Sequence, residues 1–204
     1  MIYFSPTALN IGCGKNHMPR PEWLNLDISP DVGADIVHDI RQPLPFHEDL
    51  FSRILMSHVL EHLTDPLPLM QEIWRVAKPG AELIIRVPYG SSDIAFEDPT
   101  HYRQYFANSF MYFGQPAYAA ADYGYRGDWQ VQERVLVLDK RVDRNQLPDS
   151  PSEVMELINT HRNFVEEFIC VLTAVKPLRT PTSPSKQGGI RFAFPEDIKG
   201  ASHG

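Results

Sequence analysis

The stretch LNIGCGK, residues 9–15, is the first indication of the fold of this chain. It begins as a short apolar run and turns sharply at Gly12, Cys13 and Gly14. Short apolar runs with polar or glycine boundaries are typical of buried parallel strands. Because glycine carries no Cβ, such a turn lets a ligand approach the backbone closely. The stretch predicts a buried strand that ends at a ligand-binding turn, although such turns are common and the prediction needs support from the surrounding sequence.

Runs of the same kind follow through the first half of the chain. They are bounded by polar residues, glycine or proline, and they occupy residues 22–26, 34–37, 52–56 and 81–87. Before the last of them, Asp65-Pro66 supplies a helix N-cap and a first-turn proline, and Lys78-Pro79-Gly80 supplies a stop. Apolar residues recur at helical spacing in between. Strands joined by loops and then by a helix predict a doubly wound α/β sheet.

The second half predicts further elements. Residues 130–138 and 164–175 indicate two strands, which we expect to pair antiparallel at the edge of the sheet. We expect helices at residues 107–114 and 152–160, the first within an aromatic-rich region. The remaining chain is rich in proline, serine, threonine, lysine and glycine, which predicts a flexible C-terminal tail over residues 177–204.

The composition limits the classes of function. The 204 residues fit one α/β domain, and a formal net charge of -7 lacks the basic footprint of a general nucleic-acid binder. Cys13 and Cys170 stand far apart and form no CxxC pair, which argues against a disulfide framework or a structural zinc site. The sequence has no apolar segment of membrane-spanning length and no signal-peptide pattern. We therefore expect a cytoplasmic protein.

Two carboxylates support the glycine turn as part of a binding site. Asp27 and Asp39 each follow a predicted strand, as the glycine turn does. In open α/β sheets, ligands bind at the carboxyl ends of the strands, near the point where the strand order reverses. Asp27 could accept hydrogen bonds from ribose hydroxyls, and Asp39 could accept one from an adenine amino group while the Ile40 N–H meets the ring. Together these residues predict a nucleoside-binding crevice.

Five stretches together carry a family resemblance. They are LNIGCGK (residues 9–15), WLNLDIS (23–29), ADIVHDIRQPLPF (34–46), ILMSHVLEHL (54–63) and RVAKPGAELIIRVP (75–88). As a set they resemble the class I S-adenosylmethionine (SAM)-dependent methyltransferases, notably a small bacterial branch linked to glycan and cell-surface biosynthesis. Where that family usually has an acidic residue and a third glycine, this chain has Asn10 and Asn16.

The resemblance implies a Rossmann-like, doubly wound, mostly parallel sheet with an antiparallel edge strand. It implies SAM as the methyl donor and S-adenosylhomocysteine as the product. The residues that would bind SAM are Gly12, Cys13, Gly14, Asp27, Ile28, Asp39, Ile40, Ser57 and His58. We expect the methyltransferase domain to cover residues 1–176, with residues 89–127 as an insertion or lid on the acceptor side.

Residues 58–62, HVLEH, have a second interpretation. The string HxxEH is the inverted zinc-protease motif, which needs both histidines on one helical face and a further carboxylate. Here the string starts where a strand ends, so regular helical geometry is not expected, and we predict no metal ion. The resemblance instead places Ser57 and His58 beside the methionine moiety of SAM. It gives Glu61 and His62 structural roles in the loop.

The segment EDPTHY, residues 97–102, follows the fifth predicted strand, where this family places its acceptor site. Asp98 and His101 are candidates for general-base catalysis, because histidine can accept a proton from a hydroxyl or amine near neutral pH. The alternative is a turn begun by Asp98-Pro99 with a packed histidine ring. The candidates for acceptor binding are Tyr102, Arg103, Tyr105 and Phe106.

We expect methyl transfer to an oxygen or nitrogen of a small molecule or glycan. The amino-methylating nucleic-acid enzymes often carry Asn/Asp-Pro-Pro-Tyr/Phe where this chain has SHVL, residues 57–60, which argues against a nucleic-acid substrate. Two alternatives stay open: a non-catalytic SAM-binding partner subunit, and a nucleotide-binding oxidoreductase or epimerase. The oxidoreductase motif GxGxxG fits less well, because His17 occupies its third glycine position. A homodimer is also considered.

Overall fold

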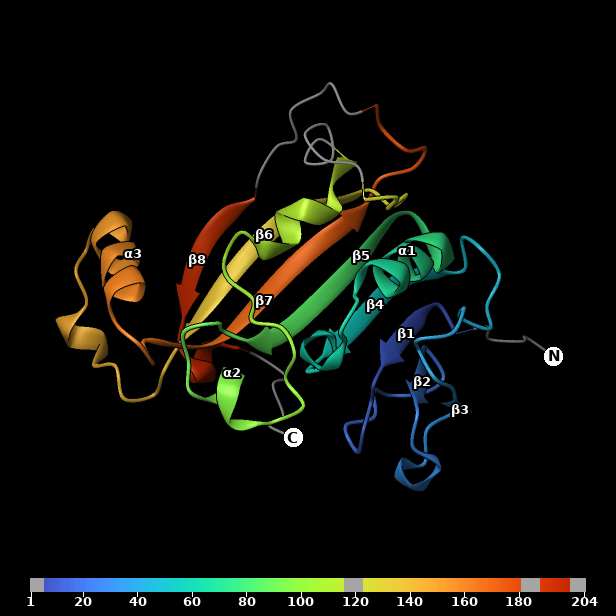
Figure 1. Cartoon of the computed structure of the whole chain (residues 1–204), viewed down its shortest axis with the longest axis horizontal. Helices are drawn as coiled ribbons and strands as arrows, with labels where there is room; N and C mark the ends of the chain where they lie inside the picture. The colour runs from blue at the N-terminus through green and yellow to red at the C-terminus, as the bar shows by residue number, and fades with distance from the viewer. Residues whose placement is uncertain (1–5, 116–122, 181–187, 199–204) are drawn as a thin grey trace.

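A single mixed sheet organises the computed structural model, which describes residues 6–115, 123–180 and 188–198 (Figure 1). The eight strands lie in the order β3-β2-β1-β4-β5-β7-β6-β8. Their bounds are β1 (Ala8–Ile11), β2 (Trp23–Asp27), β3 (Ile36–Val37), β4 (Phe51–Ser57), β5 (Ala77–Pro88), β6 (Trp129–Leu138), β7 (Val165–Ala174) and β8 (Gly189–Ala193). The helices are α1 (Leu67–Val76), α2 (Ile94–Glu97) and α3 (Pro151–Thr160), with 3-10 turns η1 (Pro30–Val32), η2 (Leu60–His62), η3 (Ser109–Phe113), η5 (Arg144–Gln146) and η6 (Pro195–Asp197).

The first half confirms the predicted parallel sheet. Strand β1 pairs parallel with β2 on one side and with β4 on the other, and β3 and β5 extend the sheet outward in parallel. The strand order therefore reverses between β1 and β4, which is where open α/β sheets bind ligands. The predicted helix forms as α1, directly after Pro66, and buries Leu69, Met70, Ile73 and Val76 against the sheet.

The second half confirms the predicted antiparallel pair but changes its position. Strand β7 pairs antiparallel with both β5 and β6, and β8 then pairs parallel with β6. The pair therefore lies inside the sheet, and β8 forms the edge. This strand belongs to the segment predicted as a flexible tail; Ala193 is buried against Val135 and Val137, and pairing with β8 satisfies backbone groups that β6 would otherwise expose.

One predicted helix is wrong. Residues 107–114 form only the 3-10 turn η3 in place of an α-helix. Phe110 and Phe113 are both buried there, and their rings stack at a centroid distance of 6.1 Å. Side chains three residues apart align in a 3-10 turn, so this geometry places both rings in the core. Helix α3 confirms the prediction for residues 152–160.

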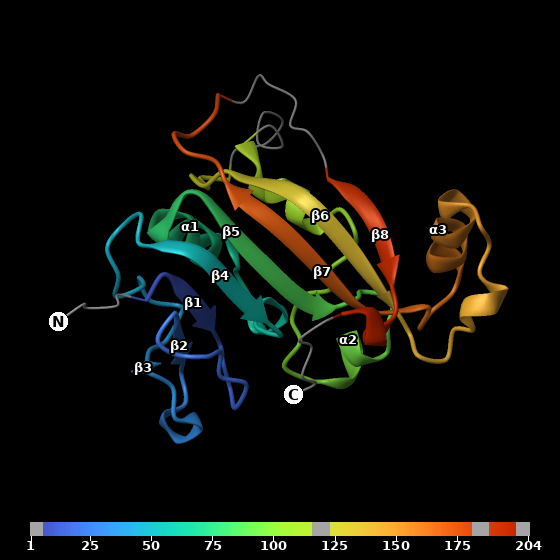
Figure 2. The same cartoon turned by 180° about the vertical axis from the view of Figure 1, so that it is seen from behind.

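The two faces of the sheet are covered unequally. Helix α1 and η3 lie over the face that holds the main core, which includes Ile85 and Phe168 (Figure 1). Figure 2 shows the opposite face of β4, β5 and β7, over which no helix of the described residues lies. The connection from β1 to β2 is a loop, as the sequence predicts, and η1 is the short turn between β2 and β3. Among the described helices, none has the length and apolarity needed to cross a lipid bilayer.

Candidate functional site

A cavity of about 480 Å³ lies at the point where the strand order reverses. Ligand pockets of proteins span about 300–1,000 Å³, so its size suits a small molecule or cofactor. It is formed by the carboxyl ends of β1, β4 and β5 together with β7 and the turn η6. Five predicted cofactor residues line it: Gly12, Cys13, Gly14, Ser57 and His58.

The glycine turn needs glycine at two positions for different reasons. Gly12 has φ +65°, and a Cβ there would meet Val59 Cγ2 at 2.4 Å, so the loop after β4 packs directly on its backbone. Gly14 has φ +49° and nothing within 4 Å of its absent Cβ, so that side of the turn is open. Burial, followed by the nearby Asp27 carboxylate, raises the pKa of the Cys13 thiol to about 11. Cys13 is therefore a neutral thiol at physiological pH.

Asp27 is tied to the glycine turn. Its Oδ2 accepts a hydrogen bond of 2.8 Å from the Gly14 N–H, and its Oδ1 accepts one of 2.9 Å from the Ser29 N–H. Each carboxylate oxygen has a second lone pair, so both can still accept a hydrogen bond from a ligand. The neighbouring Ile28 is 58% exposed and extends the same strand end.

Of the two asparagines that depart from the family pattern, Asn10 has a side-chain role in the structure. Asn10 is buried in β1, and its side-chain amide donates to Asn25 Oδ1 and to the backbone oxygen of Asn16, each at 3.0 Å. Asn25 in turn donates its N–H and its side-chain amide to Asp35 Oδ2. These contacts hold the segment after the glycine turn against β2. In the sequence, this network is indicated only by Asn10 and Asn25, two polar residues inside predicted buried strands.

The structure joins Asp39 to Arg41 rather than to the cavity. Arg41 donates from Nε to Oδ1 at 2.9 Å and from Nη2 to Oδ2 at 2.7 Å. This side-chain hydrogen bonding lowers the pKa of Asp39 to about 2. Neither Asp39 nor Ile40 lines the 480 Å³ cavity. Their roles in adenine binding stay predictions.

One wall of the cavity carries three charged side chains. Glu167 of β7 accepts from Arg86 Nε at 2.9 Å and from Arg86 Nη2 at 2.7 Å, and it also contacts His58 Nε2 at 3.1 Å. Burial disfavours the Glu167 carboxylate, but the hydrogen bonds from His58 and Arg86 outweigh it and lower its pKa. The bonds to Glu167 and Glu61 raise the pKa of His58 to about 9. The sequence analysis did not identify Arg86 or Glu167 as site residues. Each is a charged residue inside a predicted apolar strand, and that pattern could have indicated a functional role.

The backbone at His58 is unusual. Its φ of +54° lies in the left-handed region, which non-glycine residues rarely adopt. The His58 N–H donates to the Arg86 carbonyl at 2.9 Å, which fixes the turn at the end of β4. Strained residues of this kind are concentrated at functional sites.

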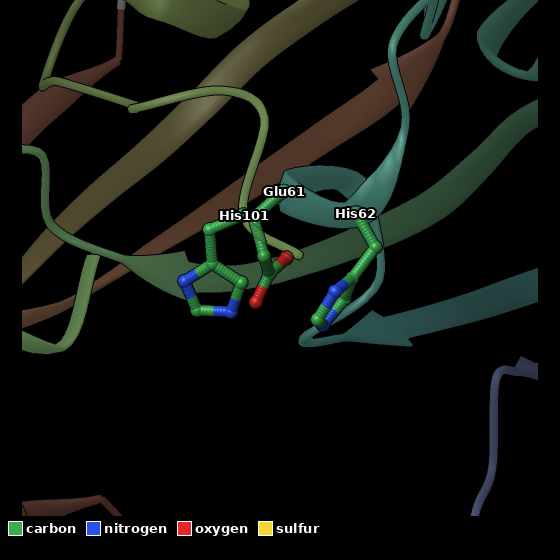
Figure 3. Close-up of side chains that lie close together, drawn as sticks. All are labelled: Glu61, His62 and His101. Atoms are coloured by element: carbon green, nitrogen blue, oxygen red, sulfur yellow. The ribbon is translucent and has the colours of Figure 1, made fainter. Parts of the chain in front are cut away.

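Next to this wall, Glu61, His62 and His101 form a cluster (Figure 3). One potential ligand atom from each of the three lies within 4.8 Å of the others. Glu61 is 1% exposed, and neither of its carboxylate oxygens has a hydrogen-bond partner among the described residues. Its Oε1 lies 3.3 Å from His58 Nδ1. The cluster is therefore one side chain away from the cavity.

The predicted pair Asp98 and His101 does come together, at 3.8 Å between Asp98 Oδ2 and His101 Nε2, which is too long for a hydrogen bond. Asp98 Oδ1 instead accepts from the Thr100 N–H and from its hydroxyl, which makes the turn that the sequence offered as the alternative. His101 Nδ1 is buried without a partner in the described structure. The backbone N–H of Tyr102 donates to the Glu61 carbonyl at 2.8 Å and docks this segment on η2.

The predicted acceptor residues lie in different surroundings. Tyr102, Arg103 and Tyr105 line a second hollow of about 510 Å³. Arg103 donates to the Thr64 carbonyl, and Tyr105 is 5% exposed. Phe106 lies against Gly90 and is 47% exposed. Residues 116–122 of the predicted lid lie outside the described residues.

Comparison with known proteins agrees with this geometry. The family model described as a methyltransferase domain matches residues 9–85. No curated protein sequence matches the chain. Three solved structures have a TM-score of 0.52: a SAM-dependent methyltransferase from Archaeoglobus fulgidus, a putative methyltransferase from Haloferax volcanii in complex with the activator Trm112, and a SAM-dependent methyltransferase from Mesorhizobium loti.

Sequence identity to these three is low. The Archaeoglobus protein is 16% identical, with 82% of this chain and 86% of that chain covered. The corresponding values are 17%, 84% and 83% for the Haloferax protein and 12%, 81% and 89% for the Mesorhizobium protein. These likenesses show the fold. The match over residues 9–85 covers the glycine turn, Asp27 and the loop after β4.

Proposed function

Because the chain carries the methyltransferase domain of the SAM-dependent methyltransferase family over residues 9–85, we propose that it transfers the SAM methyl group to an oxygen or nitrogen of a small molecule or glycan. The observation that carries this proposal is the cavity at the strand-order reversal, where the glycine turn and His58 face one space. Fold alone does not determine an acceptor, so the acceptor class is the proposed part.

The glycine turn that lines the cavity, and Asp27, which is bonded to that turn outside the cavity lining, fit SAM. Gly14 leaves open space where a side chain would otherwise stand, so a ligand can reach the backbone of the turn. Asp27 keeps one lone pair on each oxygen for the two ribose hydroxyls. Asp39 and Ile40 stay the proposed adenine contacts. SAM, when bound, supplies a methyl group on a positively charged sulfur that a lone pair of the acceptor can attack.

This chain's own task is to position the acceptor and exclude water. We assign acceptor positioning to Tyr102, Arg103, Tyr105 and Phe106, in keeping with the aromatic hollow that three of them line. His101 is the proposed proton acceptor, with Asp98 beside it at 3.8 Å. The docking of this segment on η2, directly after the Ser57-His58 loop, supports an acceptor site next to the cofactor cavity.

We also propose which partners this chain has. The Haloferax protein was solved with an activator subunit, and that finding belongs to that protein. For this chain we propose a small-molecule or glycan acceptor, no nucleic-acid substrate and a cytoplasmic location, with a homodimer as the oligomer to look for. Light scattering of the purified protein measures the oligomeric state directly.

Calorimetric titration with SAM, S-adenosylhomocysteine and NAD tests the cofactor. We expect binding of the first two and none of NAD; the reverse would favour the oxidoreductase alternative. A second assay follows S-adenosylhomocysteine formation over a panel of sugars, phenols and small amines. Tight SAM binding without turnover on any of them would contradict an enzymatic role and favour a non-catalytic SAM-binding subunit.

A further inference from the structure

We propose that Glu61, His62 and His101 bind a divalent transition-metal ion of the zinc, manganese or cobalt kind. This set differs from the HxxEH string, which suggested His58 and His62 and led us to expect no metal. In the structure His58 turns to Glu167, and His101 arrives from the loop after α2 to take its place beside His62. The inference therefore depends on a contact between residues about forty positions apart.

The three side chains converge from two segments. Figure 3 shows the Glu61 carboxylate between the imidazoles of His62 and His101. The two ring centroids lie 4.7 Å apart, and the three potential ligand atoms lie within 4.8 Å of one another. Zinc binds nitrogen and oxygen ligands at about 2.0–2.2 Å, so ligand atoms around one tetrahedral ion stand about 3.4 Å apart. The ligand atoms would therefore have to approach one another by up to about 1.4 Å when an ion binds.

Glu61 is the strongest sign of a missing partner. It is 1% exposed, and its Oε2 has no hydrogen-bond partner within the described part of the chain. A buried carboxylate is costly unless it is paired or coordinates a metal. His58 Nδ1 pairs with Glu61 Oε1 at 3.3 Å, while its Nε2 contacts Glu167. Oε2 of Glu61 stays available, and a cation between it and the two imidazoles would supply its partner.

The surrounding contacts leave the right nitrogen atoms available. Histidines that bind a metal usually engage their other ring nitrogen with an oxygen nearby. His62 Nδ1 contacts the Thr100 hydroxyl at 2.8 Å, which leaves Nε2 for an ion. That hydroxyl donates to Asp98 at 2.6 Å, so the orientation of Thr100 is itself fixed. His101 Nε2 is directed toward Asp98, and its buried Nδ1 is without a partner among the described residues.

Two imidazoles and one carboxylate leave at least one coordination position open, as in catalytic zinc sites and two-His-one-carboxylate iron sites. The role of this position rests on the proposed function: it would take the oxygen of a hydroxyl acceptor. A metal ion lowers the pKa of a bound hydroxyl, whose proton leaves to solvent water. The oxygen then bonds to the methyl carbon, and sulfur keeps the electron pair of the broken carbon–sulfur bond. In this assignment His101 is a ligand rather than the proton acceptor.

The site is tested with the metals alone. Full-length protein without an affinity tag is dialysed against a chelator and titrated with Zn²⁺ by calorimetry, and with Co²⁺ by visible absorption. We expect one equivalent of each metal. Glu61→Gln and His62→Ala should each weaken binding at least tenfold. His47→Ala is the matched control, because His47 is exposed outside the cluster and its loss should change nothing.

Thermal melting first shows whether each variant is folded. If Glu61→Gln does not fold, His62→Ala still tests the site, because His62 is only partly buried and its replacement should be tolerated. The metal site is overturned if the wild type binds metal no more tightly than His62→Ala. It is also overturned if metal binding is unchanged in both variants. Activity tests the role separately. The proposed role of the metal in methyl transfer is supported if the metal-free protein still binds SAM but no longer transfers the methyl group. One equivalent of metal should then restore the transfer. Equal activity with and without metal overturns it while SAM-dependent transfer itself stands.

Discussion

The Gly14 N–H donates a 2.8 Å hydrogen bond to Oδ2 of Asp27, which joins the turn after β1 to the end of β2. The two residues are thirteen positions apart, and the contact orients the open side of the glycine turn relative to the carboxylate. The same carboxylate is the proposed acceptor for the ribose hydroxyls. One residue therefore shapes the turn and offers a binding group.

Replacing Asp27 tests this double role. Asp27→Ala removes the acceptor for Gly14 and for the ligand, and a hydrogen bond to a charged group contributes about 1.5–3 kcal/mol. We expect SAM affinity to fall at least about tenfold, measured by calorimetry. Asp31→Ala is the control, because Asp31 is an exposed carboxylate on the following turn. Unchanged affinity in Asp27→Ala would show that the cofactor is bound elsewhere.

Gly12 should be far less tolerant of a side chain than another glycine with similar backbone angles. Gly12→Ala combines a positive φ with a 2.4 Å clash against Val59, and Gly80→Ala has φ +76° with nothing within 4 Å. The backbone alone costs about 1–2 kcal/mol, and overpacking adds about 1–3 kcal/mol. Denaturant unfolding should show the larger loss for Gly12→Ala. Addition of Val59→Ala should recover part of it; equal losses at both glycines would argue against the clash.

The Glu167 ion pair should stabilise the fold above acidic pH. The pKa of the Glu167 carboxyl group lies below its ordinary value of 4.5. The ion pair therefore stabilises the fold fully above pH 4.5, and this stabilisation is lost as the pH falls through the lowered pKa. Glu167→Gln should reduce the free energy of unfolding by about 2 kcal/mol at pH 7, and the difference from the wild type should shrink as the pH falls below 4.5 and through the lowered pKa. Glu166→Gln is the control on the neighbouring position. A difference that does not depend on pH would contradict the ion pair.

Strand β8 should hold the C-terminal segment to the sheet. Ala193→Asp places a charge against Val135 and Val137 in a buried position, and an unpaired buried charge is strongly destabilising. We expect limited proteolysis to cut this segment faster, while the body of the domain survives. Arg191→Gln should have a smaller effect, because it removes only a half-exposed ion pair of 2.7 Å with Glu133 of β6. Rapid cleavage of the wild type at β8 would instead favour the flexible tail that the composition predicted.

Several elements could be predicted from the sequence because local pattern controls them. The run from Ala8 to Ile11, the proline before α1 and the glycine turn act over a few residues, and all are found in the structure. The predicted stop at Lys78-Pro79-Gly80 lies instead inside β5, because α1 already ends at Val76. The failure at residues 107–114 has the opposite cause: Phe110 packs against Phe168, and Phe113 against Tyr125, which lie in other segments of the chain. Tertiary packing then overrides local propensity.

The positions of the first strands along the chain, the glycine turn and the carboxylate of Asp27 at a strand end follow from the sequence, because apolar periodicity and glycine geometry are local. The order of the strands in the sheet, and which polar side chains meet, depend on the tertiary structure. It brings His101 to Glu61, and Glu167 to Arg86, across 40 and 81 positions of chain, and it pairs β8 with β6. Strand pairing brings together side chains from segments that are far apart in the sequence, and such contacts leave no periodic pattern from which they could be predicted.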